Sequence, residues 1–453
     1  MSTGAAARDV AYDVLRAVRE DDAYANLLLP TRIDRARLGA ADAGLATELT
    51  YGALRLRGYY DRVIALAAGR PVERIDPPLL DVLRLGAHQL LSMRIPAHAA
   101  VNESVALAAR VAGTSKTGFV NAVLRAIERV PASEWRERVA AGSTDADDRL
   151  AALTSHPAWI IRALRQALAL EGREAELGAL LEADNAAPRV NLVALPGLVP
   201  GGELRKIGHP DRFSPYGFAP DDPFSLVARS NGTIRVQDEG SQLAALALVA
   251  ARPIAPGERW LDLCAGPGGK AALLGAEAER GGATLLANEL IPARVGLVER
   301  AVAPVKDTVT VVQADGRWYG ADHPGEFDRI LLDAPCTGLG ALRRRPEARW
   351  RKQPRDVAEL TRLQSELLES AVGALRPGGV VAYVTCSPHV GETRAVVADA
   401  LKRHPELAEL PTQQIVQDSA REPLDLAGPA AQVQLWPHRH GTDAMFIALL
   451  AKN

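Results

Sequence analysis

Cysteine is scarce in this chain: only three occur in 453 residues, and all three lie in the C-terminal half. No two of them have the CxxC spacing of zinc or redox motifs, so we expect neither a disulfide framework nor a metal site. An odd number of cysteines without an export signal indicates free thiols in a reducing compartment. The sequence therefore predicts a cytoplasmic protein that binds no metal.

Long apolar runs are also missing. No stretch approaches the roughly 18 residues that a membrane helix needs, and residues 1–19 mix acids with bases, so we expect neither a membrane span nor a secretory signal. Aromatic residues make up only 4 %, which predicts a core built mainly from Ala, Leu and Val. The formal net charge of -2 excludes a generally polycationic protein. Any nucleic-acid binding must come from local basic surface.

The pattern of apolar residues changes twice along the chain. In residues 1–141 they recur at helical spacing, which predicts an all-α domain, and the polar residues 142–148 are expected to form a linker. Residues 149–231 combine two amphipathic helices, a short strand and a turn-rich stretch at 196–222, a pattern typical of a small α+β domain. Residues 232–453 alternate strand and helix, which predicts an α/β domain with a parallel sheet covered on both faces.

Each cysteine closes a Val- and Leu-rich run of the C-terminal domain. The expected strands there are 260–264, 284–289, 309–314, 329–333 and 380–385, with a terminal hairpin of 433–436 and 445–450; the middle domain has one at 189–195. The carboxyl ends of parallel strands form the ligand crevice of an open α/β sheet. The three thiols are therefore expected beside a bound ligand.

A glycine-rich loop follows the first of these strands. It consists of Cys264, Ala265, Gly266, Pro267, Gly268, Gly269 and Lys270. Glycine lets a ligand approach the backbone closely, and a helix N-terminus offers free N–H groups. Glu289 ends the next strand 20 residues after Gly269, a spacing that suits a carboxylate bound to ribose hydroxyls. Asp315 ends the third strand, where it either meets an adenine amino group or simply forms an Asp-Gly turn.

Two other nucleotide motifs can be tested against this loop. A P-loop requires a glycine at position 264 and Ser or Thr after Lys270, but the chain has Cys264 and Ala271. The GxGxxG fingerprint of nicotinamide oxidoreductases is absent as well, since the glycines fall at 266, 268 and 269. A purely structural turn remains possible. S-adenosylmethionine is then the remaining nucleoside cofactor that this pattern predicts.

Two further strand ends carry reactive side chains. Asp333 precedes Ala-Pro-Cys336, and Thr385 precedes Cys386, so an acid and two thiols face the expected crevice. A thiolate is the soft nucleophile that C5 methylation of a pyrimidine needs, because attack at C6 makes C5 nucleophilic. A base must then remove the C5 proton before elimination. The residues alone do not decide between Cys336 and Cys386 as the nucleophile.

With these motifs in view, the sequence resembles the Fmu/Sun family of RNA cytosine-C5 methyltransferases, in particular bacterial members that act on 16S rRNA and carry a fused NusB-like domain. The likeness rests on Asp262–Lys270, Asp333–Gly338, Thr385–Ser387, Val236–Gln242 and, in the helical domain, Gly118–Arg125. It spans nearly the whole chain. It implies a class I, Rossmann-like methyltransferase domain, the cofactor S-adenosylmethionine and ribosomal RNA as substrate; another RNA such as tRNA, or a non-catalytic ribosome-assembly role, is the alternative.

The resemblance also implies roles for individual residues. Cys264 to Lys270 would form the cofactor loop, Glu289 would bind the ribose, Asp315 the adenine, and Asp333 would lie beside cofactor and target base. The nucleophile would be Cys386, and Cys336 would assist product release. The chain departs from the family twice, with Gly266 in place of the usual alanine and Glu289 in place of aspartate. We expect Gly266 only to loosen the turn.

Basic residues suggest where RNA would bind. The segment 341–355 has seven basic residues, one acid and Trp350, and we interpret it as a loop that grips phosphates near the target base. Five arginines of the helical domain either add contacts to the RNA backbone or form ordinary surface: Arg32, Arg35, Arg37, Arg55 and Arg57. His156 is expected to pack or cap, and His389 is not expected to form a dyad with Cys386. We expect a monomer.

Overall fold

The computed structural model describes residues 4–199 and 207–453, which form two compact units. Unit 1 contains the described residues up to Arg162 together with Asp184–Ala186 and Leu342–Arg351, and unit 2 contains the rest. These bounds differ from the three domains expected from the sequence, whose limits remain a prediction. Residues 200–206 of the expected turn-rich stretch lie outside the described residues.

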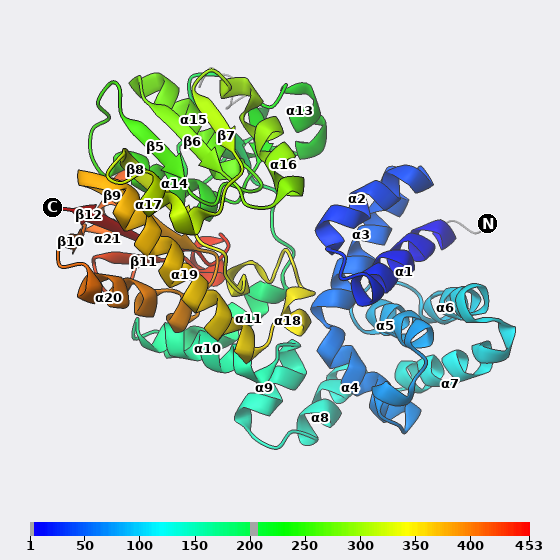
Figure 1. Cartoon of the computed structure of the whole chain (residues 1–453). Helices are drawn as coiled ribbons and strands as arrows, with labels where there is room; N and C mark the ends of the chain where they lie inside the picture. The colour runs from blue at the N-terminus through cyan, green and yellow to red at the C-terminus, as the bar shows by residue number, and fades with distance from the viewer. Residues whose placement is uncertain (1–3, 200–206) are drawn as a thin grey trace. The chain divides into compact units, whose positions relative to one another are not determined.

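Unit 1 is helical, as the periodicity predicts (Figure 1, blue to cyan). Its helices are α1 (Ala5–Glu20), α2 (Ala25–Ala36), α3 (Ala40–Arg55), α4 (Arg57–Ala68), α5 (Pro77–Leu91), α6 (Ala97–Ala112), α7 (Thr117–Glu128), α8 (Ala132–Ala141), α9 (Ala146–Thr154) and the short α18 (Ala348–Arg351). The core consists largely of Ala, Val and Leu, among them the fully buried Leu49, Val63 and Leu124. Aliphatic packing thus compensates for the shortage of aromatic residues.

The polar stretch 142–148 does not link the two units. It forms the turn between α8 and α9 and the beginning of α9, and both helices belong to unit 1. Asp145 caps α9, since its carboxylate accepts a hydrogen bond from the backbone nitrogen of Asp148 at 2.8 Å. An N-cap favours Ser, Thr, Asp and Asn. The polar composition therefore reflects a helix start, and the expectation of a linker is wrong.

Unit 2 is built on an eight-stranded sheet in the order β10-β12-β9-β8-β5-β6-β7, with β11 paired to β12. The strands are β5 (Arg259–Asp262), β6 (Thr284–Asn288), β7 (Val309–Val312), β8 (Phe327–Asp333), β9 (Leu375–Thr385), β10 (Leu407–Glu409), β11 (Gln432–Gln434) and β12 (Phe446–Lys452). β5 to β9 are parallel, whereas β12 runs antiparallel to β9, β10 and β11. The predicted α/β class is confirmed, including the hairpin of β11 and β12.

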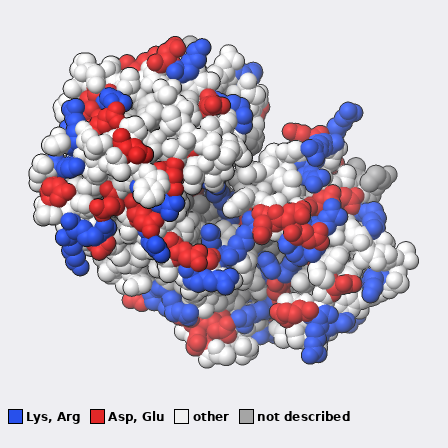
Figure 2. Space-filling model, in the orientation of Figure 1, with Lys and Arg blue, Asp and Glu red and all other residues white. Residues whose placement is uncertain are grey.

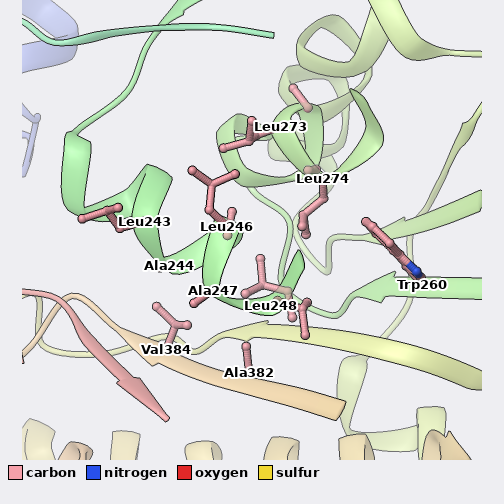
Figure 3. Packing of buried hydrophobic residues seen from close by; sticks show 14 of the residues in the cluster. Leu243, Ala244, Leu246, Ala247, Leu248, Trp260, Leu273, Leu274, Ala382 and Val384 are labelled. Carbon is pink, nitrogen blue, oxygen red and sulfur yellow. The ribbon is translucent and has the colours of Figure 1, made fainter. Parts of the chain in front are cut away.

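Helices cover both faces of this sheet (Figure 1, green to red). One face packs against α14 (Glu239–Ala250), α15 (Gly269–Gly281), α16 (Pro292–Val302) and α21 (Thr412–Ser419); the other packs against α17 (Tyr319–Asp322), α19 (Pro354–Ala374) and α20 (Arg394–Arg403). In β9, Ala382 and Val384 point to the first face and Val381 and Tyr383 to the second. Figure 3 shows leucines of α14 and α15 above Ala382 and Val384. This period of two buries the strand on both sides.

A smaller antiparallel sheet precedes the large one. Its order is β2-β3-β1-β4. The elements are α10 (Ala158–Ala169), α11 (Leu177–Asn185), β1 (Leu192–Ala194), β2 (His209–Pro210), β3 (Gly217–Ala219), α13 (Pro223–Arg229) and β4 (Ile234–Val236). The predicted strand at 189–195 thus corresponds to β1, and the mixture of helix and strand matches the α+β expectation.

The visible surface carries charge of both signs. Figure 2 shows Lys and Arg interspersed with Asp and Glu on each unit, in keeping with the net charge of -2. Within the part of the chain that the structure describes, we find no helix with the length and apolar composition of a membrane span.

Candidate active site

The predicted site residues meet at the carboxyl ends of four neighbouring strands. The loop that contains Cys264 follows β5, Glu289 follows β6, Asp333 ends β8, and Cys386 follows β9. The order β9-β8-β5-β6 places these ends side by side. In open α/β sheets this edge is where ligands bind. The fold therefore brings together the residues that the sequence analysis singled out.

The loop after β5 turns sharply into α15. Gly268 has φ +103°, a conformation that favours glycine, and a Cβ there would lie 2.3 Å from the Cβ of Ala301. The next residue, Gly269, begins α15. Glycine at 268 thus permits both the turn and the close approach of α16, which carries Ala301.

Glu289 is bonded to this loop. Its Oε2 accepts a hydrogen bond from the backbone nitrogen of Gly266 at 3.0 Å, and its Oε1 accepts one from Ile291 at 2.8 Å. The side chain is buried. A Cβ on residue 266 would lie 2.0 Å from Oε2. Gly266 therefore admits the glutamate, and the expectation that it only loosens the turn is wrong.

Asp262 is a deeply buried acid of the crevice. It is 1 % exposed, and no side chain among the described residues donates a hydrogen bond to its carboxylate. Burial, reinforced by the charge of Asp333, raises the pKa of Asp262 to about 8. An unpaired buried carboxylate is costly unless a cation or a proton joins it. Its position under the loop suits a positively charged ligand.

Lys270 and Asp333 form an ion pair across the crevice. Nζ of Lys270 donates to Oδ2 of Asp333 at 2.7 Å, and the lysine side chain is 11 % exposed. Burial acts to lower the pKa of Lys270, but Asp333 outweighs it and the net shift is upward. The charge of Cys386 also contributes to this upward shift. Lys270 is therefore an ammonium that lies near a thiol.

The thiols of Cys336 and Cys386 lie 3.4 Å apart, sulfur to sulfur. Their loops are joined by backbone hydrogen bonds from Ala334 to Val384 and from Gly340 to Cys386, at 2.8 and 2.9 Å. The hydrogen bond with Cys386, together with burial and the charges of Cys386 and Glu392, raises the pKa of Cys336. These surroundings hold Cys336 as a thiol.

Cys264 and Asp315 differ from these central residues. Burial, assisted by the surrounding carboxylates, raises the pKa of Cys264, which disfavours a thiolate there. The carboxylate of Asp315 accepts hydrogen bonds from the guanidinium of Arg317, with the shortest at 2.6 Å, and this contact lowers the pKa of Asp315. Their assignment to cofactor binding remains a prediction.

Two buried acids, Asp262 and Glu392, were given no role by the sequence analysis. Glu392 follows Cys386 by six residues and is 0 % exposed. Its carboxylate accepts hydrogen bonds from Thr337, next to Cys336, and from Ser387, next to Cys386. Nothing in the local sequence His389–Thr393 distinguishes this acid from a surface residue. Only the paired Thr and Ser after the two cysteines hinted at a shared partner.

The basic segment is not the exposed loop that its composition suggested. Leu342–Arg351 belongs to unit 1, and Arg349 is 0 % exposed. Its guanidinium donates to Asn185 Oδ1 at 2.7 Å and to the carbonyl oxygens of Arg55 and Asp184 at 3.0 and 2.7 Å. Burial lowers its pKa to about 10. Arg349 binds these oxygens rather than phosphate, so the interpretation of Arg349 as part of a phosphate grip is wrong, whereas Arg345 and Arg355 are exposed.

The other basic candidates divide in the same way. Arg55 is buried, and Arg57 lies over the ring of Trp350 within unit 1, whereas Arg35 and Arg37 are exposed and Arg32 is partly exposed.

His156 is buried with Nδ1 2.8 Å from the carbonyl oxygen of Thr154, in line with a packing role. Nδ1 of His389 accepts a hydrogen bond from Gly391 at 3.0 Å, and burial lowers the pKa of His389.

No cluster of His, Cys, Asp and Glu suited to a metal ion occurs within residues 4–199 and 207–453.

Comparison with known proteins identifies related sequences for both parts of the chain. Residues 250–451 match the family described as 16S rRNA methyltransferase RsmB/F, and residues 5–129 match the NusB family. A Mycobacterium tuberculosis protein named "Putative methyltransferase" is 48 % identical over 98 % of this chain and 96 % of its own length. A Bacillus subtilis protein named "Probable ribosomal RNA small subunit methyltransferase B" is 30 % identical over 98 % of each chain.

Solved structures share the fold. The crystal structure of PH0851 superposes with a TM-score of 0.79 at 23 % identity, covering 100 % of this chain and 99 % of its own. A methyltransferase homologue from Pyrococcus horikoshii superposes with a TM-score of 0.53 at 24 % identity, covering 66 % of this chain and 96 % of its own. At these identities the likeness concerns the fold alone.

Proposed function

Because the chain belongs to the RsmB/F family of RNA methyltransferases, with a NusB-family domain before the S-adenosylmethionine-dependent domain, we propose that it methylates C5 of a cytosine in 16S ribosomal RNA. The observation that carries the proposal is the pair of thiols 3.4 Å apart beside the glycine-rich loop. Cytosine C5 needs a thiolate at C6 before it can accept a methyl group. The crevice offers two thiols for attack and release.

S-adenosylmethionine fits the crevice described above. When bound, it supplies a methyl group on a sulfonium centre. When it is ionised, the buried Asp262, which receives no side-chain hydrogen bond among the described residues, would offer a negative charge to such a cation. Each oxygen of Glu289 accepts one backbone hydrogen bond and keeps a lone pair for a ribose hydroxyl. Residues 264–270 would hold the cofactor, with Asp315 at the adenine.

The reaction assigns a separate step to each thiol. Cys386 would form a bond from its sulfur to C6 of cytosine, which opens the C5–C6 double bond and makes C5 nucleophilic. C5 would then take the methyl group, while the bond from that methyl group to the sulfonium sulfur breaks and a neutral thioether leaves. A base then removes the C5 proton, and the bond between sulfur and C6 breaks to release methylated RNA and free Cys386. Cys336 assists this elimination. Asp333, paired with Lys270, orients the target cytosine. The target cytosine leaves its stack to reach the thiols.

The electrostatic surroundings support this division of labour. The positive charge of Lys270 lies near Cys386 and favours a thiolate there. Cys336 instead faces the negative charges of Cys386 and Glu392, which favour the neutral thiol. A thiolate attacks and a neutral thiol does not. This contrast supports the proposed assignment of attack to Cys386 and of release to Cys336.

The choice of 16S rRNA rests on the name of the Bacillus subtilis relative and on the match to the NusB family. Exposed Arg35, Arg37 and Arg355 are candidates for phosphate contacts. We propose that the protein acts as a monomer in the cytoplasm. Methylation of another RNA such as tRNA is the alternative at the same site.

The test incubates purified protein with methyl-labelled S-adenosylmethionine and with 16S rRNA, partly assembled small subunits or tRNA. Bisulfite sequencing of the product RNA then locates 5-methylcytosine. One methylated position in 16S rRNA is expected. Labelling of tRNA alone would identify tRNA, rather than 16S rRNA, as the substrate. The absence of 5-methylcytosine in every RNA would overturn the proposed reaction.

A further inference from the structure

We propose that Glu392 is a positioning residue that holds the loops of Cys336 and Cys386 together, so that both thiols reach adjacent atoms of one pyrimidine ring. The inference rests on the proposed function. It concerns a side chain that does not touch the reacting atoms and acts through its neighbours.

The carboxylate of Glu392 is bonded to both cysteine loops. Oε1 accepts the backbone N–H of Thr337 at 2.7 Å, and Oε2 accepts the hydroxyls of Thr337 and Ser387 at 2.5 and 2.7 Å. Thr337 directly follows Cys336, and Ser387 directly follows Cys386. One side chain therefore bridges the two residues that follow the thiols, in addition to the backbone hydrogen bonds that join their loops.

Glu392 is itself fixed from other elements. Its backbone carbonyl accepts a hydrogen bond from the hydroxyl of Tyr383 in β9 at 2.8 Å. Nε2 of Gln364, in α19, donates to Oε1 at 3.3 Å and to the carbonyl oxygen of Pro335 at 2.8 Å. The acid thus connects the end of β9 and the helix α19 with the loop after β8. Hydrogen bonds to a charged acceptor are strong and directional, which suits a rigid arrangement.

A role in packing alone explains this arrangement poorly. A buried carboxylate loses its hydration, and well-packed apolar residues stabilise a core as well or better. Here the charged group lies where three donors from the two thiol-bearing loops converge. Its charge also contributes to the raised pKa of Cys336, behind the contact with Cys386 and burial. Position and charge both act on the thiol pair.

The first test compares Glu392→Ala with Glu392→Gln in the full-length protein. Loss of the clamp lets the loops separate, and a shift of about 1 Å at reacting groups lowers turnover by about 100-fold. For Glu392→Ala we expect a fall of that order in kcat, with KM for RNA within about threefold of wild type. Glu392→Gln should recover most activity, because its amide oxygen accepts the Thr337 N–H while its amide nitrogen donates to the two hydroxyls.

A matched control separates positioning from general stability. Glu258 is also buried, at 4 % exposure, and it binds Arg329 and Trp260 near the start of β5, away from the thiols. Glu258→Gln removes a buried charge without touching the cysteine loops. Assays at a temperature where all variants are folded by circular dichroism should show a kcat close to wild type for this control. An equal loss in Glu258→Gln and Glu392→Ala would overturn the proposal.

A second readout needs no RNA. Diamide accepts two electrons and two protons from a pair of thiols, which become a disulfide while diamide becomes the hydrazine. In wild type, Cys336 and Cys386 should pair rapidly because their sulfurs are 3.4 Å apart. The rate, followed by peptide mass spectrometry, should fall at least about tenfold in Glu392→Ala if the loops separate, and remain near wild type in Glu392→Gln and Glu258→Gln.

The two readouts separate the two proposals. Slower thiol pairing in Glu392→Ala, in a protein whose wild type makes no 5-methylcytosine, would overturn the proposed reaction and leave the clamp standing. Unchanged thiol pairing and unchanged kcat in Glu392→Ala, with an active wild type, would overturn the clamp alone.

Discussion

Oε2 of Glu289 lies 3.0 Å from the backbone nitrogen of Gly266, and a Cβ on residue 266 would lie 2.0 Å from the same oxygen. The two positions at which this chain departs from the Fmu/Sun pattern are therefore in contact. A longer acid reaches the loop because residue 266 has no side chain. The usual pair of alanine and aspartate would divide the same space differently, with a longer residue in the loop and a shorter acid.

The first prediction is that these two positions are coupled. Gly266→Ala alone should displace Glu289 and cost about 1–3 kcal/mol in the free energy of unfolding, as overpacking of a buried site does. In the double variant with Glu289→Asp, the shorter acid should remove most of this cost. Urea unfolding of the four proteins in a double-mutant cycle measures the coupling. Purely additive effects would show that the two departures are independent.

The second prediction concerns the thiols. Cys386→Ala should abolish methylation, because no other group forms the bond to C6. Cys336→Ala should form that bond but release the product slowly, so a covalent protein–RNA adduct should accumulate. A denaturing gel with end-labelled RNA detects the adduct. Cys264→Ala is the comparison variant and should accumulate no adduct, since the raised pKa of Cys264 disfavours a thiolate there and Cys336 remains available for release. An adduct with Cys386→Ala but not with Cys336→Ala would reverse the two roles.

Local sequence was sufficient to predict the strands that carry the site. Most of β5, β6, β8 and β9 is buried, and each contains an apolar run that is closed by a polar or reactive residue. The short β10 had no such signal. Glu392 was missed because its partner Thr337 lies 55 residues away, and nothing local encodes that contact.

The prediction for the basic segment 341–355 failed for the same reason. Composition distinguishes a cation from an apolar residue, but it does not reveal whether the partner is a phosphate or a carbonyl oxygen. Arg349 finds its acceptors on Arg55 and Asp184, 294 and 165 residues away in sequence. Such long-range pairing of buried charge is decided by tertiary packing.

The third prediction follows from the pKa of Asp262. Burial raises it from an ordinary 3.8 to about 8, so between these pH values the folded protein binds more protons than the unfolded chain. The contribution of Asp262 to the free energy of unfolding is therefore largest below the ordinary pKa, decreases as the pH rises toward about 8, and then levels off. Urea unfolding at pH 5, 6, 7 and 8 should show this decline in wild type. Asp262→Asn should reduce the slope, whereas an identical slope in both proteins would contradict the assigned pKa.

Asp262→Asn should also weaken cofactor binding, and this effect should grow with pH. A cationic ligand prefers the ionised carboxylate, so wild type gains affinity as Asp262 deprotonates and the asparagine variant does not. Calorimetric titration with S-adenosylmethionine at pH 6 and 8 measures the difference. Equal affinity of the two proteins at pH 8 would place the cation elsewhere in the crevice.

The last prediction separates structural from RNA-binding arginines. Arg349→Met leaves Asn185 and the carbonyl groups of Arg55 and Asp184 without their donor, and each unsatisfied buried acceptor costs about 1–3 kcal/mol. We expect unit 1 to lose about 3 kcal/mol or more in the free energy of unfolding, measured by hydrogen exchange of its amides in the full-length protein. Arg355→Met, at an exposed position, should change stability by less than about 0.5 kcal/mol and weaken RNA binding in a salt-dependent manner. If Arg349→Met left amide protection unchanged and weakened RNA binding instead, Arg349 would contact phosphate after all.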